Sequence, residues 1–138
     1  MIKPNIPIKK PGIGRFIAIL DHSRNNRRLS LAPHITRCIK KGEIHEILVS
    51  LDNTEKTESL NKFVYLGFVE FTNACVLKQG DEVKINGKPV GTLAGFEERD
   101  IPNHMNLILD SDKITQSGFR LGLKLSDKIH FSGERDGK

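Results

Sequence analysis

Residues 22–28 (HSRNNRR) hold the densest group of side chains that could bind a charged ligand. Three arginines beside a turn can bind a phosphate or a carboxylate, because each guanidinium offers a planar fork of hydrogen-bond donors. The two asparagines between them can direct backbone N–H groups toward the same anion. The alternative is a solvated turn whose arginine stems lie over a sheet. The candidate anion ligands from this turn are His22, Arg24, Arg27 and Arg28.

A second polar group occupies residues 97–106 (EERDIPNHMN). A histidine beside acidic residues in a loop can act as an acid, a base or a metal ligand. The chain has no HxH, HxxxH or HExxH spacing, so its five histidines could bind a metal only if distant segments converged. We therefore expect no metal, and Pro102-Asn103-His104 most simply shapes a turn. Arg99, His104 and Asn106 join the candidate anion ligands.

No motif of covalent or cofactor chemistry is present. The sequence has no GxSxG, no P-loop and no dinucleotide-binding fingerprint. Its two cysteines, Cys38 and Cys75, lie far apart in apolar stretches without a CxxC pattern. We expect them to be reduced thiols of a cytosolic protein. We thus favour a non-catalytic protein over an enzyme, with no catalytic residue and no cofactor.

The charge is unevenly distributed along the chain. Residues 1–41 hold ten Lys/Arg and one acid, whereas residues 42–138 hold twelve Lys/Arg and sixteen acids, which together give the net charge of +5. A basic first third could serve a nucleic acid, or it could pack beside an acidic surface of its own domain or of a second subunit. Single-strand binders expose aromatic residues on a basic groove, but Phe63, Tyr65, Phe68 and Phe71 lie in an apolar stretch. Nucleic acid is therefore the weaker alternative.

The segments that must position these residues have the pattern of short β-strands. Asn86-Gly87 is the strongest hairpin signal, because both central residues of a type I′ turn need positive φ. With this pair as the loop, Val83 is expected to face Val90 across the hairpin. Pro89 marks an edge or a bulge, since it lacks an N–H.

Other strands are expected where apolar and β-branched residues gather between turn residues. The expected strands are residues 14–21, 29–31, 43–51, 63–77 with a break at Gly67 or Thr72-Asn73, 106–109 and 121–131, the last with Leu121, Leu123 and Leu125 on one face. Residues 34–41 could form a short helix or an irregular strand, and the spacing of the apolar residues in 35–39 favours the helix.

Roughly six to eight short strands with at most one short helix predict an all-β fold. We expect a small antiparallel β-barrel over residues 13–132, with a sandwich as the alternative. Residues 1–12, with three prolines, are expected to form an extended N-terminal arm, and residues 133–138 a flexible tail. No apolar run is long enough to span a membrane, and no signal peptide is recognisable, so we expect no membrane partner.

From about residue 63 to residue 131 the pattern resembles the enzyme IIA component of the glucitol/sorbitol phosphotransferase system. The similarity lies in residues 78–80 (KQG), 90–95 (VGTLAG), His104 before the strand 106–109, and the closing strand near 128–131. It implies a small barrel-like β fold of a bacterial protein. The family transfers a phosphoryl group through a histidine on the strand that matches residues 64–71, where this chain has none; the position falls near Phe68 or Glu70. The resemblance therefore implies a non-phosphorylatable relative.

Together these patterns predict a non-catalytic binding or regulatory module. Its ligand would be a small anionic or sugar-like metabolite, held by the seven candidate residues of the two polar loops. The N-terminal arm could join subunits into a homo-oligomer. Two alternatives remain: a phosphocarrier that uses His104, and a nucleic-acid binder that uses the basic first third.

Overall fold

The computed structural model describes residues 10–33, 35–53, 59–98 and 105–133. The elements within these ranges, in chain order, are β1 (Gly12–Arg24), β2 (Thr36–Ile39), β3 (Ile44–Ser50), β4 (Phe63–Phe71), β5 (Cys75–Lys78), β6 (Glu82–Ile85), β7 (Lys88–Glu98), β8 (Met105–Asp110), α1 (Gly118–Leu121) and β9 (Lys128–Ser132).

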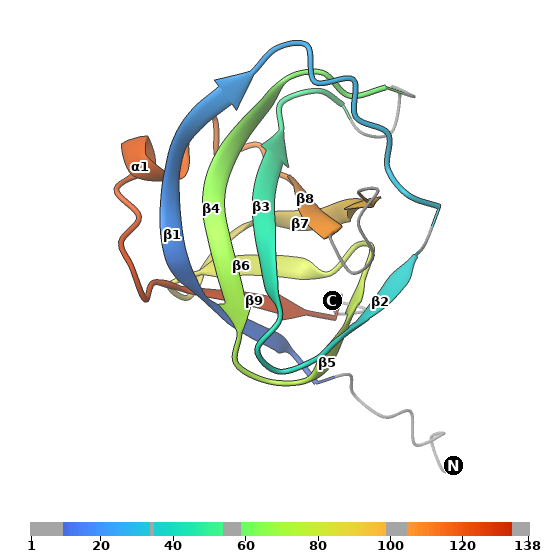
Figure 1. Ribbon diagram of the computed structural model, residues 1–138, viewed down its shortest axis with the longest axis vertical. Coiled ribbons are helices and arrows are strands. Elements are labelled where there is room, and N and C mark those ends of the chain that lie inside the picture. Colours follow the sequence, from blue (N-terminus) through green and yellow to red (C-terminus); the bar gives the residue numbers. More distant parts are fainter. Residues whose placement is uncertain (1–9, 34, 54–58, 99–104, 134–138) are drawn as a thin grey trace, which may run out of the picture.

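Seven of these strands form a closed barrel in the order β1-β4-β3-β8-β7-β6-β9, and β9 pairs back onto β1 (Figure 1). Strands β2 and β5 form a separate two-stranded sheet. All neighbouring barrel strands are antiparallel except β3 and β8, which run parallel. The prediction of a small all-β barrel with a short helix is confirmed.

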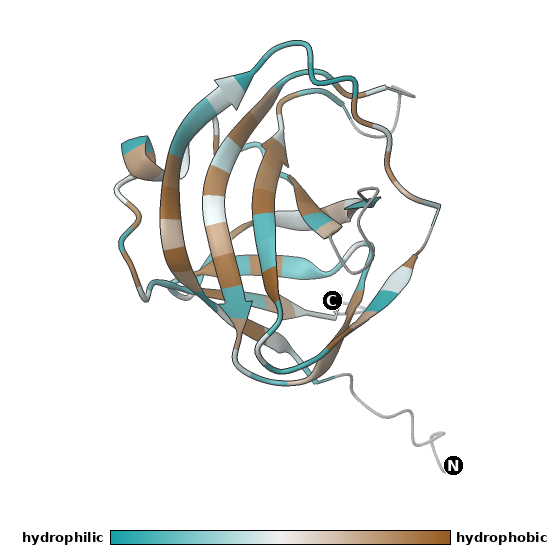
Figure 2. Cartoon of the chain, viewed as in Figure 1, coloured by the Kyte–Doolittle hydropathy of each residue, from teal (hydrophilic) through white to brown (hydrophobic). Residues whose placement is uncertain are grey.

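Apolar side chains at alternate positions of the strands fill the barrel. Ile47 and Val49 of β3 and Leu107 and Leu109 of β8 belong to one interior cluster, and all four are fully buried. Figure 2 shows this apolar character along the strands of the wall. Burial of this kind is the main favourable contribution to folding.

The opposite faces of the same strands carry a second apolar cluster. Its members are Leu29, Leu48, Leu60, Phe63, Tyr65, Ala94 and Ile108. Residues 25–33, here called the cover segment, lie over this cluster on the way from β1 to β2 (Figure 1). Leu29 pairs with Leu60 in an isolated bridge, and the Ala32 N–H donates to the Phe96 carbonyl of β7 (2.7 Å). The predicted strand at 29–31 is thus reduced to one bridge.

The predicted hairpin forms, with one correction to its register. Asn86 and Gly87 have φ of 51° and 82°, as a type I′ turn requires. Val83, however, pairs with Gly91 and not with Val90. A register shift follows the Lys84–Pro89 pair, so the bulge predicted near Pro89 is what displaces the expected partner.

The preference for a helix in residues 34–41 is wrong. Residues 36–39 form β2, which pairs with β5 through the register Thr36↔Lys78 to Ile39↔Cys75. Of the expected helical face only Ile39 is buried, whereas Ile35 is 58% exposed. Pairing with a strand distant in sequence has overridden the local apolar spacing. The break between β4 and β5 falls at residues 72–74, which confirms Thr72-Asn73 as the position of the break.

The strand predicted for residues 121–131 is also wrong over most of its length. Ser117 caps α1 at its start, and Gly122 ends the helix in the left-handed conformation (φ 82°). A turn then places Ser126 at φ 73°, and only residues 128–132 form β9. These local turn signals outweigh the alternation of leucines, and Leu125 is 65% exposed.

Two further predictions concern the cysteines and membrane spans. Cys38 and Cys75 are both free, as predicted. No helix within the described residues has the length and apolarity needed to cross a bilayer.

Candidate ligand-binding site

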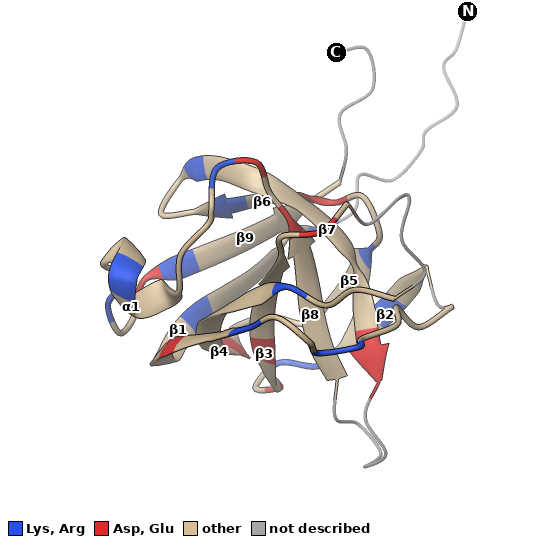
Figure 3. Ribbon diagram, turned by 90° about the horizontal axis from the view of Figure 1, so that it is seen from above, with Lys and Arg blue, Asp and Glu red and all other residues tan. Residues whose placement is uncertain are grey.

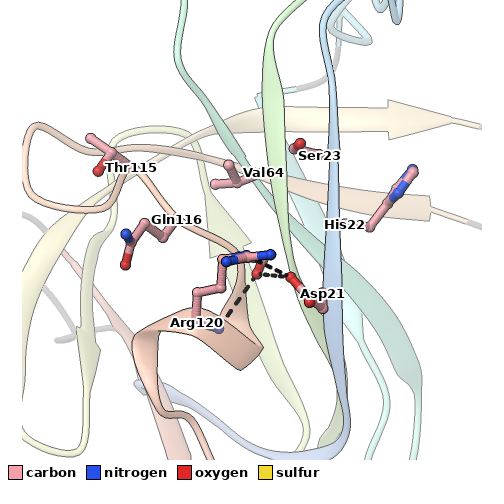
Figure 4. Close-up of a pocket in the computed structure, with 8 residues that line it drawn as sticks. Asp21, His22, Ser23, Val64, Thr115, Gln116 and Arg120 are labelled. Atoms are coloured by element: carbon pink, nitrogen blue, oxygen red, sulfur yellow. Dashed lines mark hydrogen bonds and ion pairs between the residues drawn. The ribbon is translucent and has the colours of Figure 1, made fainter.

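A β-bulge in β1 creates the starting point of the site. The register with β4 passes from Ile19↔Gly67 to His22↔Tyr65, so two residues of β1 lie opposite the single residue Leu66. Bulges of this kind re-aim side chains next to binding sites. One of these two residues is Asp21, whose carboxylate turns toward the segment that leads into α1 (Figure 4).

Close packing of Gly118 brings that segment against the wall. A Cβ atom at position 118 would overlap the carbonyl oxygen of Leu66, so only glycine allows this approach. Helix α1 consequently rests on β1 and β4. This contact places Ser117 and Arg120 within reach of Asp21.

The Asp21 carboxylate is the centre of a small polar network. Its Oδ1 accepts hydrogen bonds from the Ser117 hydroxyl (2.8 Å) and from Arg120 Nε (3.1 Å). Ser117 is buried, whereas the side chains of Asp21 and Arg120 are 43% and 67% exposed. Among the described residues, no protein group bonds the second oxygen of Asp21 or the terminal nitrogens of Arg120, so both retain hydrogen-bonding capacity.

A pocket of about 370 Å³ opens beside this network. The lining residues are Asp21, His22, Ser23, Val64, Thr115, Gln116, Ser117 and Arg120. Figure 4 shows that the His22 ring points away from Gln116 and Arg120; it packs instead on the ring of Tyr65, with centroids 4.7 Å apart. The volume falls within the range typical of small-molecule sites.

Three of the predicted residues meet in a different network, on the outer side of the wall. Arg27 of the cover segment donates to Glu97 Oε1 (2.7 Å) and to the Tyr65 hydroxyl (3.1 Å). Asn106 donates to the same Glu97 oxygen (2.7 Å), and His22 stacks on Tyr65. His22, Arg27 and Asn106 are therefore brought together through Tyr65 and Glu97, neither of which was among the predicted ligand residues.

The charge of Arg27 is held by this network. Desolvation alone would lower the pKa of Arg27, but the hydrogen bond that Arg27 donates to Tyr65 and the charge of Glu97 raise it above its ordinary value. Both members of the pair are largely buried, with side chains 12% and 11% exposed. The pair joins the cover segment to β7 beside the second apolar cluster.

Of the remaining predicted residues, the two that the structure describes, Arg24 and Arg28, do not line the pocket. Arg24 ends β1 next to Ser23 and is exposed. Arg28 is exposed with φ of 53°, and its backbone N–H donates to Asn61 Oδ1 (3.2 Å). Arg99 and His104 lie outside the described residues.

Sequence reasoning missed most of the pocket residues. The missed residues carry no motif: two lie near the end of β1 and three in the polar segment 115–120. They are Asp21, Ser23, Thr115, Gln116 and Arg120. The one available signal was the Ser117 to Gly122 pattern, in which an N-cap residue and a terminal glycine indicate a helical turn. No local sequence pattern predicts the bulge in β1 that turns Asp21 toward this helical turn.

A buried histidine lies elsewhere in the wall and belongs to the core. His45 is 3% exposed; its Nδ1 contacts the Met105 carbonyl (2.9 Å) and its Nε2 contacts Glu43 Oε1 (2.8 Å). Both nitrogens are thus occupied by protein groups. In the part of the chain that the structure describes, no group of three or more His, Cys, Asp or Glu side chains could hold a metal ion.

Comparison with known proteins identifies one relationship. The sequence matches a family of unknown function (DUF6917) over residues 7–132. No curated protein and no solved structure matches the chain.

Proposed function

The chain belongs to the DUF6917 family of unknown function, and from its site we propose that it is a non-catalytic module that binds a small polyhydroxylated, sugar-like molecule. The ligand would occupy the pocket between the end of β1 and residues 115–120. The observation that carries this proposal is the Asp21 carboxylate, which lines a polar pocket while Ser117 and Arg120 hold its Oδ1.

The mixture of donors and acceptors supports a ligand rich in hydroxyl groups. Each sugar hydroxyl both donates and accepts, so it is best bound by groups of both kinds. The Asp21 carboxylate accepts, the Arg120 guanidinium donates, and the Gln116 amide does both. Hydroxyls of Ser23 and Thr115 add further partners, and the pocket volume suits one small ring or a short polyol.

The balance of charge favours a neutral ligand over a phosphate. The positive charge of Arg120 is already matched by Asp21, whose oxygen lies 3.1 Å from Arg120 Nε. A dianionic group placed against Arg120 would also meet the Asp21 carboxylate, and like charges at short range repel. The sequence predicted an anionic or a sugar-like ligand, and of these two classes we retain the sugar-like one.

The position of His22 argues for binding without catalysis. Among the described residues that line the pocket, it is the one histidine, the residue type most often used for proton transfer. Its ring stacks on Tyr65 and points away from the polar residues of the pocket (Figure 4). The arrangement supports recognition of hydroxyl groups more than general acid–base chemistry.

A ligand screen followed by single substitutions tests this proposal. We expect a neutral sugar or polyol to raise the melting temperature, and at tenfold excess over Kd the stabilisation would be about 1.4 kcal/mol. Asp21→Asn and Gln116→Ala should weaken Kd roughly 10- to 100-fold, the value of a hydrogen bond to a charged or buried partner. Asp112→Asn is the matched control, because Asp112 is an exposed residue of the same loop outside the pocket.

Two results would contradict the proposal. One is a panel of neutral sugars, polyols and phosphosugars in which none shifts the melting temperature or the amide NMR signals of residues 21–23 and 115–120. The other is a ligand whose affinity falls no more with Asp21→Asn than with Asp112→Asn. Selective binding of phosphosugars that depends on Arg24 would instead restore the anionic ligand.

A further inference from the structure

Exposed apolar side chains gather around α1. Of the eight large apolar residues that are exposed within the described chain, four lie in this region: Ile17, Phe119, Leu121 and Leu125. We call these four residues the α1 patch. Phe119 and Leu125 are 66% and 65% exposed. Ile17 adjoins the turn that carries Leu125, because Phe16 exchanges backbone hydrogen bonds with Ser126 and Asp127.

The local structure holds these side chains outward in a defined arrangement. Capping by Ser117 and Gly122 fixes both ends of α1. In the following turn the Lys124 N–H donates to Asp127 Oδ2 (2.9 Å), and the Asp127 N–H donates to the Lys124 carbonyl (3.0 Å). Leu125 therefore stands at the tip of a closed turn. Figures 1 and 3 both show α1 projecting from the side of the barrel.

Charges around the patch are positive on its solvent side. Lys124 and Lys128 are exposed, and the exposed Arg120 is paired with Asp21. Figure 3 colours the basic part of the α1 ribbon blue. The neighbouring acids, in contrast, accept hydrogen bonds from the protein: Asp21 from Ser117 and Arg120, and Asp127 from the Lys124 backbone. The patch thus presents protruding apolar tips among cations.

We propose that the α1 patch docks this protein onto an anionic lipid surface. Phe119 and Leu125 enter the interfacial region, and Lys124 and Lys128 lie among the lipid headgroups, the pattern of interfacial anchors. The expectation of no membrane partner concerned spanning segments and signal peptides, whereas this surface would lie on a membrane without crossing it. The proposal is independent of the ligand pocket.

The chemistry of the patch favours lipid over a protein partner. A peptide partner would need a groove, but the apolar side chains here stand on a projection (Figures 1 and 3). Lysines are depleted in the cores of protein interfaces, whereas they favour the anionic leaflet. A second copy docked patch to patch would bring like charges together, which opposes association.

Vesicle flotation with the full chain gives the first measurement. We expect binding to vesicles of phosphatidylcholine with 30% phosphatidylserine, and little binding to phosphatidylcholine alone. Phe119→Ser combined with Leu125→Ser should reduce the partition coefficient at least tenfold. Lys124→Gln combined with Lys128→Gln should reduce it about fivefold per cation. Ile44→Ser and the pair Lys40→Gln and Lys41→Gln are matched controls, because these residues are exposed and lie outside the patch.

The absence of tryptophan from the sequence allows a site-specific second measurement. Phe119→Trp and Ile44→Trp each create a single-tryptophan protein with the reporter at an exposed position. We expect the emission of the Phe119→Trp protein to shift to shorter wavelength on anionic vesicles and to be quenched by brominated lipid. The Ile44→Trp protein should show neither change.

Several outcomes would overturn the proposal. They include no vesicle binding by a folded protein, equal binding to neutral and anionic vesicles, and equal responses of the two tryptophan reporters. A dimer in light scattering that Phe119→Ser converts to a monomer would assign the patch to a second copy instead. All substituted apolar residues are exposed, so circular dichroism should confirm that each variant remains folded.

Discussion

The Arg27–Glu97 and Arg120–Asp21 pairs both join a loop to the barrel wall through an arginine and a carboxylate, but their surroundings are opposite. The first pair is largely buried, with both side chains about one-tenth exposed, and Tyr65 and Asn106 complete its hydrogen bonds. The second is open to solvent, with side chains 43% and 67% exposed. The same residue types therefore serve two different purposes on one molecule.

The comparison separates a structural pair from a candidate binding pair. In the buried network each polar group already faces a protein partner, so an incoming ligand would have to displace one of them. In the pocket the carboxylate and the guanidinium retain unused hydrogen-bonding positions beside a cavity. Unused capacity beside a cavity, more than the presence of charged residues, therefore indicates where a ligand binds.

The largest expected effect comes from opening the buried pair. Arg27→Met keeps the apolar stem but removes the guanidinium that contacts the buried Glu97 carboxylate, which should lower the free energy of unfolding by about 3 kcal/mol. Urea denaturation measures this loss. Arg28→Met, a neighbouring exposed arginine, is the control and should change stability by less than about 0.5 kcal/mol. Equal effects at the two positions would remove the distinction between a structural and an exposed arginine.

The next effect concerns the contact that assembles the pocket. Gly118→Ala places a methyl group against the Leu66 carbonyl, so α1 must shift away from β4. We expect a loss of about 2 kcal/mol from overpacking, together with loss of ligand binding. Gly122→Asn is the control, because a side chain there meets no atom within 4 Å and asparagine tolerates its left-handed backbone. Stability and binding unchanged in Gly118→Ala would show that α1 is not held by this approach.

A smaller and pH-dependent effect is expected at Asp52, which is connected through Asn61 to the segment that carries the buried Arg27. The backbone N–H groups of Lys62 and Asn61 donate to its carboxylate (3.0 and 2.7 Å) and lower the pKa of Asp52 below its ordinary value of 3.8. Asn61 in turn accepts two hydrogen bonds. Its backbone carbonyl accepts from the Arg27 N–H, and its side-chain oxygen accepts from the Arg28 N–H.

Because the folded-state pKa of Asp52 is depressed, the ionised form stabilises the fold. This stability is present above pH 3.8 and is lost as the pH falls through the folded-state pKa. Asp52→Asn should therefore cost about 1 kcal/mol at pH 7, and the gap to the wild type should close at lower pH. A gap for Asp52→Asn that does not narrow as the pH falls below 3.8 would contradict this assignment.

The smallest expected effect is the coupling energy of the exposed pair, which compares the two ion pairs directly. A double-mutant cycle with Asp21→Asn and Arg120→Gln should give a coupling energy below about 0.5 kcal/mol, because exposed ion pairs contribute little to stability. The same cycle on Arg27 and Glu97 should give a coupling several times larger. Both cycles are read from chemical denaturation without ligand. A large coupling in the exposed pair would mark it as structural and weaken its role as a binding pair.

Local signals explain which parts of the fold were predictable. The Asn86-Gly87 turn formed because its backbone needs are local, and the alternating apolar residues of β3 and β8 formed strands because two apolar faces must be buried. The helix expected in residues 34–41 failed because β2 pairs with a partner distant in sequence. The strand expected at residue 121 failed because two capping residues and a turn at Ser126 outweighed the leucine alternation.

The sequence by itself determined the all-β class and the type I′ hairpin, since these follow from side-chain pattern and backbone preference within a few residues, and it favoured a barrel over a sandwich. It also pointed to His22, Arg27 and Asn106, which do converge, although on a buried network. Only the tertiary structure decided where the pocket lies, because Asp21 and Arg120 are 99 residues apart in the chain. A one-residue bulge in β1 and a close approach at Gly118 bring them together, and both depend on strands packed from the whole length of the molecule.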